Sequence, residues 1–272
     1  MLTRYKLLIL TIFIVLLAML PTGCGGKVVH DKDEQSTEMP ELTIGIEFYE
    51  PFYYIDTDGK IKGIDAEIAE EACRRLGYKP RYKVVKWVEK NEDLKNGKVD
   101  AVWACFSMTD REDDYLWAGP YLYDRQIIMV PKDSDKYNMS QLNSCRIGTQ
   151  RTTQSEALVL QGCGGLLKNV EILSFDTMDE AIAAMREGMV EAVAGHETAL
   201  MHYTKNEPDK FRIFDKGMKN VYMGVAFDKD GNRILVKALQ QVLEDMLQDG
   251  TTASIVEKYG LNGKAFTQKG GV

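Results

Sequence analysis

Residues 65–77, which read DAEIAEEACRRLG, hold the clearest helical pattern in the chain. Ile68, Ala72 and Leu76 recur at the spacing of one helix face, and Gly77 provides a stop. Runs with the pattern of strands lie on both sides, at 42–47, 82–87 and 99–104. A strand, a helix and a strand in this order favour a mostly parallel sheet with helices on its faces.

A second set of alternating elements begins further along the chain. Residues 145–150, 170–175 and 190–194 have the pattern of strands, and residues 178–187 have the spacing of a helix. Two further helical patterns follow, at 233–249 and 252–259. A chain of 272 residues is long enough to divide these elements between two lobes.

The composition excludes several classes of protein. With 44% hydrophobic and 28% charged residues, the chain is too apolar for a disordered protein and too polar for a protein with many membrane spans. The net charge of −7 argues against nucleic acid as a partner. Three histidines and five scattered cysteines lack the spacing of a zinc cluster, so we expect no metal and no cofactor.

Residues 1–23 have the pattern of an export signal. A short positive start precedes the apolar run 7–20, which is shorter than the roughly 20 residues that a bilayer-spanning helix needs. Pro21-Thr22-Gly23-Cys24 then resembles the cleavage box of a bacterial lipoprotein, which implies lipidation of Cys24. The alternative is a plain N-terminal anchor helix. Residues 24–40 are polar, and we expect them to form a tether between the lipid and the fold.

A set of motifs in a fixed order resembles one protein family. Gly63-Ile64-Asp65-Ala66-Glu67-Ile68 is similar to the signature of family 3 extracellular solute-binding proteins, the amino-acid receptors of ABC importers. Further matching motifs follow along the chain, at 100–101, 107–111, 117–121, 148–153 and 188–193. The resemblance covers roughly residues 41–262. One such motif would be weak evidence, whereas the ordered set is strong evidence.

The resemblance implies an α/β, two-lobe periplasmic-binding-protein-like (type II) fold with two hinge strands. Lobe 1 would comprise residues 41–131 and the return segment 222–265, and lobe 2 would comprise residues 132–221. The chain would leave lobe 1 near Val130-Pro131 and return near 222–224. In such a fold the ligand lies between the lobes, at the carboxyl ends of strands, and a hinge motion closes over it.

The resemblance also assigns the ligand carboxylate to Arg111. A guanidinium can give a carboxylate two parallel charge-assisted hydrogen bonds. The alternative is a surface arginine paired with Glu112 or Asp113. Ser107 is expected to supply a hydroxyl and its backbone amide to the same end of the ligand.

Two threonines, Thr152 and Thr153, begin the first helix of lobe 2 in this scheme. The positive end of a helix attracts carboxylates, although the same threonines also suit a simple helix cap. Ala104 and Cys105 fall in the strand that relatives use for binding, and the Cys105 thiol would pack against the ligand.

Three other positions match those where the family surrounds the ligand side chain. Tyr49 and Trp87 match aromatic positions, with core packing as the alternative for each. Glu47 ends the first strand, where it could meet a cationic ligand group or simply be solvated. Trp103 lies within a buried strand pattern, so we expect it in the core instead.

His196 is the main departure from the family pattern. Relatives usually carry an aspartate there, which pairs with the ligand α-ammonium. A neutral histidine can accept one hydrogen bond but offers no negative charge. Either Glu197 takes over this role, or the ligand is not an ordinary α-amino acid; a histidine satisfied at the strand end is the plainest alternative.

Cys145 and Cys163 flank one strand-helix unit. The strand runs up and the helix runs back, so the two ends could meet at one edge. A disulfide between them could form outside the cytoplasm, and free thiols are the alternative.

The sequence thus predicts a monomeric lipoprotein that binds a small polar carboxylate, most simply an amino acid, without catalysis. Its partners would be an ABC importer permease and the membrane, and its location would be extracytoplasmic. Two alternatives are an enzyme that resembles cyclohexadienyl dehydratase and a binding protein that presents its ligand to a sensor. Catalysis would need an acid or a base in the cleft, where His196 and Glu197 are the candidate pair.

Overall fold

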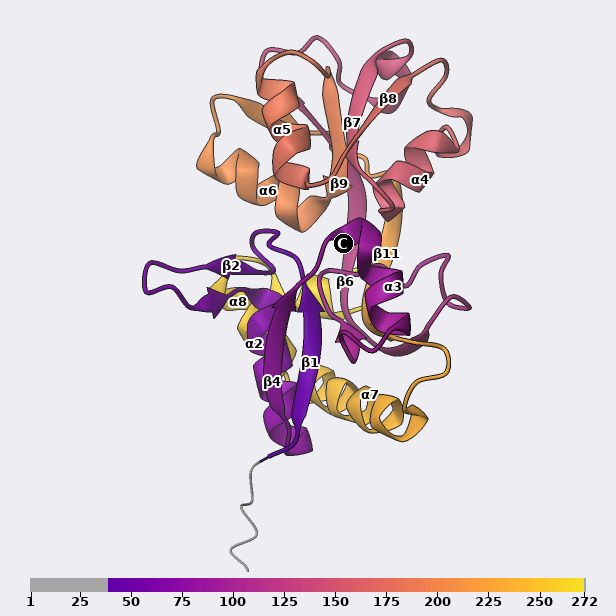
Figure 1. The fold of residues 1–272 in the computed structure, drawn as a ribbon. Coiled ribbons are helices and arrows are strands. Elements are labelled where there is room, and N and C mark those ends of the chain that lie inside the picture. The colour runs from indigo at the N-terminus through magenta and orange to yellow at the C-terminus, as the bar shows by residue number, and fades with distance from the viewer. Residues whose placement is uncertain (1–38, 272) are drawn as a thin grey trace, which may run out of the picture. The chain divides into compact units, whose positions relative to one another are not determined.

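The computed structural model describes residues 39–271, which form two lobes joined by a pair of long strands (Figure 1). The predicted signal segment, the predicted lipid-bearing Cys24 and nearly all of the predicted tether lie outside the described residues. Within the part of the chain that the structure describes, no helix has both the length and the hydropathy of a bilayer span.

Lobe 1 is built on a parallel sheet. Strand β1 (Glu41–Ile46) pairs in parallel with β4 (Lys79–Val84) and with β5 (Ala101–Val102). Helix α2 (Ile64–Leu76) precedes β4 and packs against it. This is the strand-helix-strand unit that the opening sequence pattern predicts.

Glycines mark both ends of α2. Gly63 precedes the helix with a φ of 132°, and a Cβ there would lie 2.0 Å from the carbonyl oxygen of Phe52. Gly77 ends the helix in the left-handed conformation, and its amide donates to the Arg74 carbonyl. Because Gly63 lets the chain turn so close to Phe52, the first helical turn brings Asp65 into the interior, where it is fully buried.

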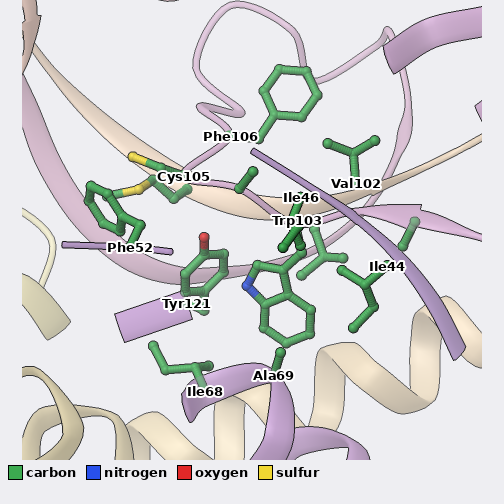
Figure 2. Packing of buried hydrophobic residues seen from close by; sticks show 14 of the residues in the cluster. Ile44, Ile46, Phe52, Ile68, Ala69, Val102, Trp103, Cys105, Phe106 and Tyr121 are labelled. Carbon is green, nitrogen blue, oxygen red and sulfur yellow. The ribbon is translucent and has the colours of Figure 1, made fainter. Parts of the chain in front are cut away.

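Large aromatic side chains fill the core of lobe 1. Trp103 and Tyr121 are both fully buried, with ring centroids 5.5 Å apart, which confirms the core position predicted for Trp103. Figure 2 shows these rings close to Ile68 and Ala69 of α2. The sheet and α2 are therefore fixed to each other through a wide apolar contact.

Two antiparallel strands cross between the lobes: β6 (Leu116–Pro131) and β11 (Lys219–Phe227). Their pairing is interrupted by an irregularity between Met223 and Val225. From Gln126 to Pro131, β6 also pairs with strands of lobe 2, and this stretch contains the predicted crossing at Val130-Pro131. The sequence reads as one apolar strand here, and it does not reveal where the strand changes its partners.

Lobe 2 repeats the parallel arrangement. Strand β7 (Arg146–Gln150) lies between β8 (Glu171–Phe175) and β9 (Ala192–His196), and both pairings are parallel. Strand β10 (Phe211–Ile213) pairs with β6. Three helices belong to this lobe: α4 (Gln154–Leu160), α5 (Met178–Arg186) and α6 (Glu197–Asn206). Parallel strands inside each lobe and antiparallel crossing strands confirm the predicted fold class.

The remaining elements are short segments or helices that complete the lobes. They are β2 (Tyr54–Ile55), β3 (Ile61–Lys62), η1 (Trp87–Glu89), α3 (Lys90–Lys95), η2 (Met139–Leu142), η3 (Cys163–Gly165), α7 (Arg233–Gln248), α8 (Thr251–Lys258) and α9 (Gly263–Thr267). Helices α7 and α8 match the two helical patterns predicted after residue 230. Helix α7 packs on β6 and α2, so the last part of the chain returns to lobe 1.

Candidate functional site

A cleft lies between the lobes at the ends of their parallel strands, and its empty space, open solvent included, is about 310 Å³. Side chains from both lobes line it: Glu47, Tyr49, Trp87, Ala104, Cys105, Ser107, Arg111, Gln150, Thr153, Gln154 and His196. The structure thus brings together the residues that the sequence selected for ligand binding. Thr152 lies at the edge of the same cleft, through contacts with two basic side chains of lobe 1.

Arg111 reaches from lobe 1 to the loop that follows β7. Its Nη2 atom donates to the backbone carbonyl of Thr152 at 3.1 Å, and the guanidinium lies 5.5 Å from the ring of Phe106. Glu112, one of the alternative partners, instead accepts a hydrogen bond from the Tyr222 hydroxyl. The guanidinium is therefore placed in the cleft, where it would be accessible to a ligand carboxylate.

The buried carboxyl group of Asp65 contacts the backbone at the bottom of the cleft. Asp65 Oδ2 accepts hydrogen bonds from the Cys105 amide at 2.6 Å and from the Tyr121 hydroxyl at 3.0 Å. Burial raises the pKa of Asp65 to about 7. Cys105 has a φ of 51°, which is unusual for a residue with a side chain, so these contacts help to fix a strained backbone beside the ligand space.

Several polar groups on the walls are buried without a partner in the described structure. They include the Trp87 indole nitrogen and the Ser107 hydroxyl. A buried polar group without a partner is unfavourable, so such groups are suited to hydrogen bonds with a ligand.

Lobe 2 contributes the turn between β7 and α4. The Thr153 side chain caps α4 by accepting from the Glu156 amide, and its hydroxyl donates to the Gln150 carbonyl at 2.6 Å. The Thr152 amide donates to the Glu156 carboxylate at 2.6 Å. The cap that the sequence predicts is present, whereas a ligand role for Thr152 and Thr153 stays a prediction.

Glu47 of lobe 1 is joined to lobe 2 through Gln150. The Gln150 side-chain amide donates to both carboxylate oxygens, at 2.8 and 2.9 Å. Burial raises the pKa of Glu47 to about 7, although the Gln150 hydrogen bond and the charge of Lys90 act in the opposite direction. Sequence reasoning missed Gln150, because glutamine at a strand end carries no distinctive signal.

Lys90 was also missed, and it lies next to the site. Its ammonium donates to the Trp87 carbonyl at 3.1 Å and to the Thr152 hydroxyl at 3.0 Å, and it lies 4.5 Å from the Trp87 ring centroid. Burial lowers its pKa to about 8, and Arg111 acts in the same direction. Its position one turn after Trp87 was the available signal, because residues three apart share a helix face.

His196 lies at the end of β9, with its ring directed toward β6. Its Nδ1 atom is 3.4 Å from Asp124 Oδ2, and its Nε2 atom is 3.1 Å from Gln126 Nε2. Glu197 is turned to Arg125, with one oxygen 2.5 Å from Nη2 and the other bonded to Nε. In the structure Glu197 is therefore engaged by Arg125.

The cysteines of the described residues are all free thiols: Cys73, Cys105, Cys145 and Cys163. The disulfide between Cys145 and Cys163 is thus absent from the structure. Cys163 is directed elsewhere, with its Sγ 3.4 Å from the Leu158 carbonyl oxygen and 3.4 Å from Met218 Sδ. Among residues 39–271, no group of three or more His, Cys, Asp or Glu side chains is placed to hold a metal ion.

A cleft that two lobes share, with crossing strands behind it, defines a solute-binding fold. Residues 42–262 match the family described as bacterial extracellular solute-binding proteins, family 3, and the chain belongs to that family. This confirms the resemblance that the ordered motifs gave.

Two curated relatives and one solved structure illustrate the similarity. The chain is 28% identical over 223 residues to the L-cystine-binding protein TcyA of Bacillus subtilis, a match that covers 80% of each chain. It is 25% identical to the putative ABC transporter arginine-binding protein 2 of Escherichia coli, over 78% of this chain and 86% of that protein. A solved structure of an ancestral arginine-binding protein bound to arginine matches with a TM-score of 0.73 and 29% identity, over 81% of this chain and 99% of that one.

Proposed function

We propose that this protein is a monomeric receptor that binds an amino acid or a related small carboxylate and delivers it to an ABC importer. The observation that carries the proposal is Arg111, whose guanidinium stands in the interlobe cleft and is bonded to a neutral carbonyl. A ligand carboxylate is a stronger partner for a guanidinium than a carbonyl is. The named relatives bind amino acids, which agrees with this ligand class.

Two of the contacts that join the lobes indicate how a ligand would be held. Arg111 meets the Thr152 carbonyl, and Glu47 meets the Gln150 amide. The ligand carboxylate would accept hydrogen bonds from the Arg111 guanidinium and from the neighbouring Ser107. The ligand side chain would lie between Tyr49 and Trp87. Closure of lobe 2 over the ligand would then be a hinge motion of β6 and β11.

The delivery step is supported by a relative, the putative ABC transporter arginine-binding protein 2, and the membrane anchor is supported by the sequence. Cys24 follows a lipoprotein-like box, and an acyl chain adds about 0.8 kcal/mol of membrane affinity per buried CH₂. A protein held at the membrane would meet its permease without diffusing away. Replacing Cys24 with Ser should release the protein from the membrane fraction of cells, and unchanged membrane association would contradict the anchor.

A thermal-shift screen of the full-length protein tests the ligand class. The probes are the common amino acids, amines, dicarboxylates and prephenate. A ligand at 100 times its dissociation constant adds about 2.7 kcal/mol to folding, so a true ligand raises the melting temperature clearly. Arg111→Ala should abolish the shift, and Arg81→Ala, on the exposed face of β4, is the control.

Three outcomes would contradict the proposal. Failure of every carboxylate to shift the melting temperature would remove the receptor function. Turnover of prephenate would favour the enzyme alternative. An unchanged shift of the melting temperature in Arg111→Ala would show that Arg111 does not bind the ligand carboxylate.

A further inference from the structure

Lys90 is a charged side chain buried beside the cleft. It is the first residue of α3, and only 4% of its surface is exposed. Its ammonium donates to two neutral oxygens, the Trp87 carbonyl at 3.1 Å and the Thr152 hydroxyl at 3.0 Å. A buried charge whose partners are neutral is unfavourable, so the surroundings of Lys90 favour the arrival of an anion.

The acid whose charge acts on Lys90 is held by another residue. Both carboxylate oxygens of Glu47 accept from the Gln150 amide, at 2.8 and 2.9 Å. Burial and the charge of Arg111 lower the pKa of Lys90 to about 8, and the charge of Glu47 acts in the opposite direction. Lys90 therefore stays mainly protonated at neutral pH, while its hydrogen bonds within residues 39–271 go to neutral groups.

Lys90 and Arg111 converge on one residue of lobe 2. Lys90 donates to the side-chain oxygen of Thr152, and Arg111 Nη2 donates to the backbone carbonyl of the same residue at 3.1 Å. The ring of Phe106 also lies beside both cations, with its centroid 5.6 Å from Lys90 Nζ and 5.5 Å from Arg111 Cζ. Two cations of lobe 1 thus contact two neutral oxygens of a single residue. A carboxylate also presents two oxygens, and its negative charge makes each hydrogen bond stronger.

The contact with Thr152 depends on how the two lobes meet. Thr152 has a φ of 59°, in the left-handed region that is unfavourable for a β-branched residue. A ligand enters the cleft only when the lobes separate, which removes the Thr152 oxygens from both cations. Lys90 and Arg111 then face the ligand space from lobe 1, together with the buried Ser107 hydroxyl and Trp87 indole nitrogen, which have no partner in the described structure.

We infer that Lys90 is a second carboxylate-binding residue, and that one oxygen of the ligand carboxylate accepts from Lys90 and the other from Arg111, in place of the two Thr152 oxygens. The inference rests on the proposed function and deepens it, because it makes Lys90 a residue that determines specificity for an anionic headgroup. The competing role is a simple latch, in which Lys90 joins the lobes through Thr152 and does not touch the ligand.

Isothermal titration calorimetry on the full-length protein tests the inference. The probes are the twenty common L-amino acids, succinate and prephenate. Lys90→Met removes the charge and retains the length of the side chain, so it should weaken every acid that binds the wild-type protein by about tenfold or more. Lys95→Met, at an exposed position of the same helix, is the matched control and should leave each affinity unchanged. A smaller loss in Lys90→Met would overturn the inference.

A double-mutant cycle separates ligand binding from a latch. Thr152→Val removes the hydroxyl that accepts from Lys90 and retains the shape of the side chain. If Lys90 contacts the ligand, Lys90→Met should weaken binding by the same factor in the Thr152→Val protein as in the wild-type protein. If Lys90 is a latch, that factor should disappear, because the partner of Lys90 in lobe 2 is already absent. The second result would overturn the inference.

A second variant keeps the test decisive if Lys90→Met does not fold. Lys90→Gln retains a hydrogen-bond donor and loses the charge, so it should also weaken binding by about tenfold or more. The melting temperature without ligand verifies that each variant is folded. A folded Lys90→Gln protein that binds as tightly as the wild type would overturn the inference and leave the receptor function intact. Failure of every probe to bind the wild-type protein would instead remove the receptor function itself.

Discussion

The two lobes share a strand order but differ in how their interiors are filled. The core of lobe 1 contains large buried aromatic side chains, with Trp103, Tyr121 and Phe106 fully buried. The sheet of lobe 2 separates two smaller clusters, in which Phe211 and Phe214 are the buried aromatic residues. Large aromatic side chains bury more area than other residues, so lobe 1 has the larger aromatic contribution to its core.

The same difference extends to the cleft. Lobe 1 supplies its charged and aromatic side chains: Glu47, Arg111, Tyr49 and Trp87. Lobe 2 supplies Gln150, Thr153, Gln154 and His196, none of which is a carboxylate, a lysine or an arginine. Under the proposed function, lobe 1 would therefore carry the recognition and lobe 2 the closure.

The largest expected effect concerns the core of lobe 1. Trp103→Ala removes a fully buried ring and should lower the free energy of unfolding by about 3–5 kcal/mol. Ile182→Val, in the core of lobe 2, should lower it by about 0.5–1.5 kcal/mol. Urea denaturation followed by circular dichroism measures both. Equal losses would break the contrast between the two cores.

A second effect compares the two sides of the cleft. Arg111→Ala should weaken ligand binding by about 2–5 kcal/mol, because it removes one partner of a desolvated charge pair. Gln154→Ala, on lobe 2, should weaken it by about 1 kcal/mol at most, since its amide already donates to Asp110. Calorimetric titration of the ligand found in the screen provides both values. A greater loss from Gln154→Ala would transfer the recognition to lobe 2.

A third effect is the pH dependence that the buried Asp65 imposes on lobe 1. Its folded pKa is raised to about 7, so the folded state holds a proton that the unfolded state has lost above an ordinary aspartate pKa of about 4. Stability should therefore fall as the pH rises between these two values, by about 1.4 kcal/mol per pH unit for this one group. Asp65→Asn should flatten that slope in urea denaturation at a series of pH values. An unchanged slope would show that Asp65 does not titrate in this range.

The smallest expected effect concerns the helix cap of lobe 2. Thr153→Ala removes the cap of α4 and should destabilise the protein by about 1 kcal/mol. Thr153→Ser retains the hydroxyl and should restore most of that loss. The difference is measurable as a change in the urea midpoint. A Ser variant as unstable as the Ala variant would show that the hydroxyl is not what stabilises this turn.

Local patterns were sufficient to predict much of the fold and of the site. The helix that ends at Gly77 follows from its own spacing. The cleft positions of Glu47 and Arg111 follow from the family resemblance, with Glu47 at the end of one predicted strand and Arg111 shortly after another. In each case the relevant signal lies within a few residues of the element that it places.

Features that depend on contacts between distant segments could not be predicted in this way. Lys90 is buried, and its ammonium donates to the hydroxyl of Thr152 in the other lobe. The ring of His196 turns toward Asp124, which lies 72 residues earlier in the chain. Cys163 could point to Cys145 by its spacing alone, but its thiol lies against Met218. Side-chain directions of this kind are set by packing between elements and leave no local pattern.

The pairing of β6 with β11 also makes lobe 2 an exchangeable unit. The chain enters and leaves that lobe on adjacent strands, where Tyr123 lies opposite Tyr222 in the ladder. A graft of the intervening segment from a relative would thus have to match a single two-stranded ribbon at its ends. Such chimaeras would combine the charged lobe 1 side of the cleft from one protein with lobe 2 of another. Evolution could therefore change the two sides of the ligand cleft at separate rates.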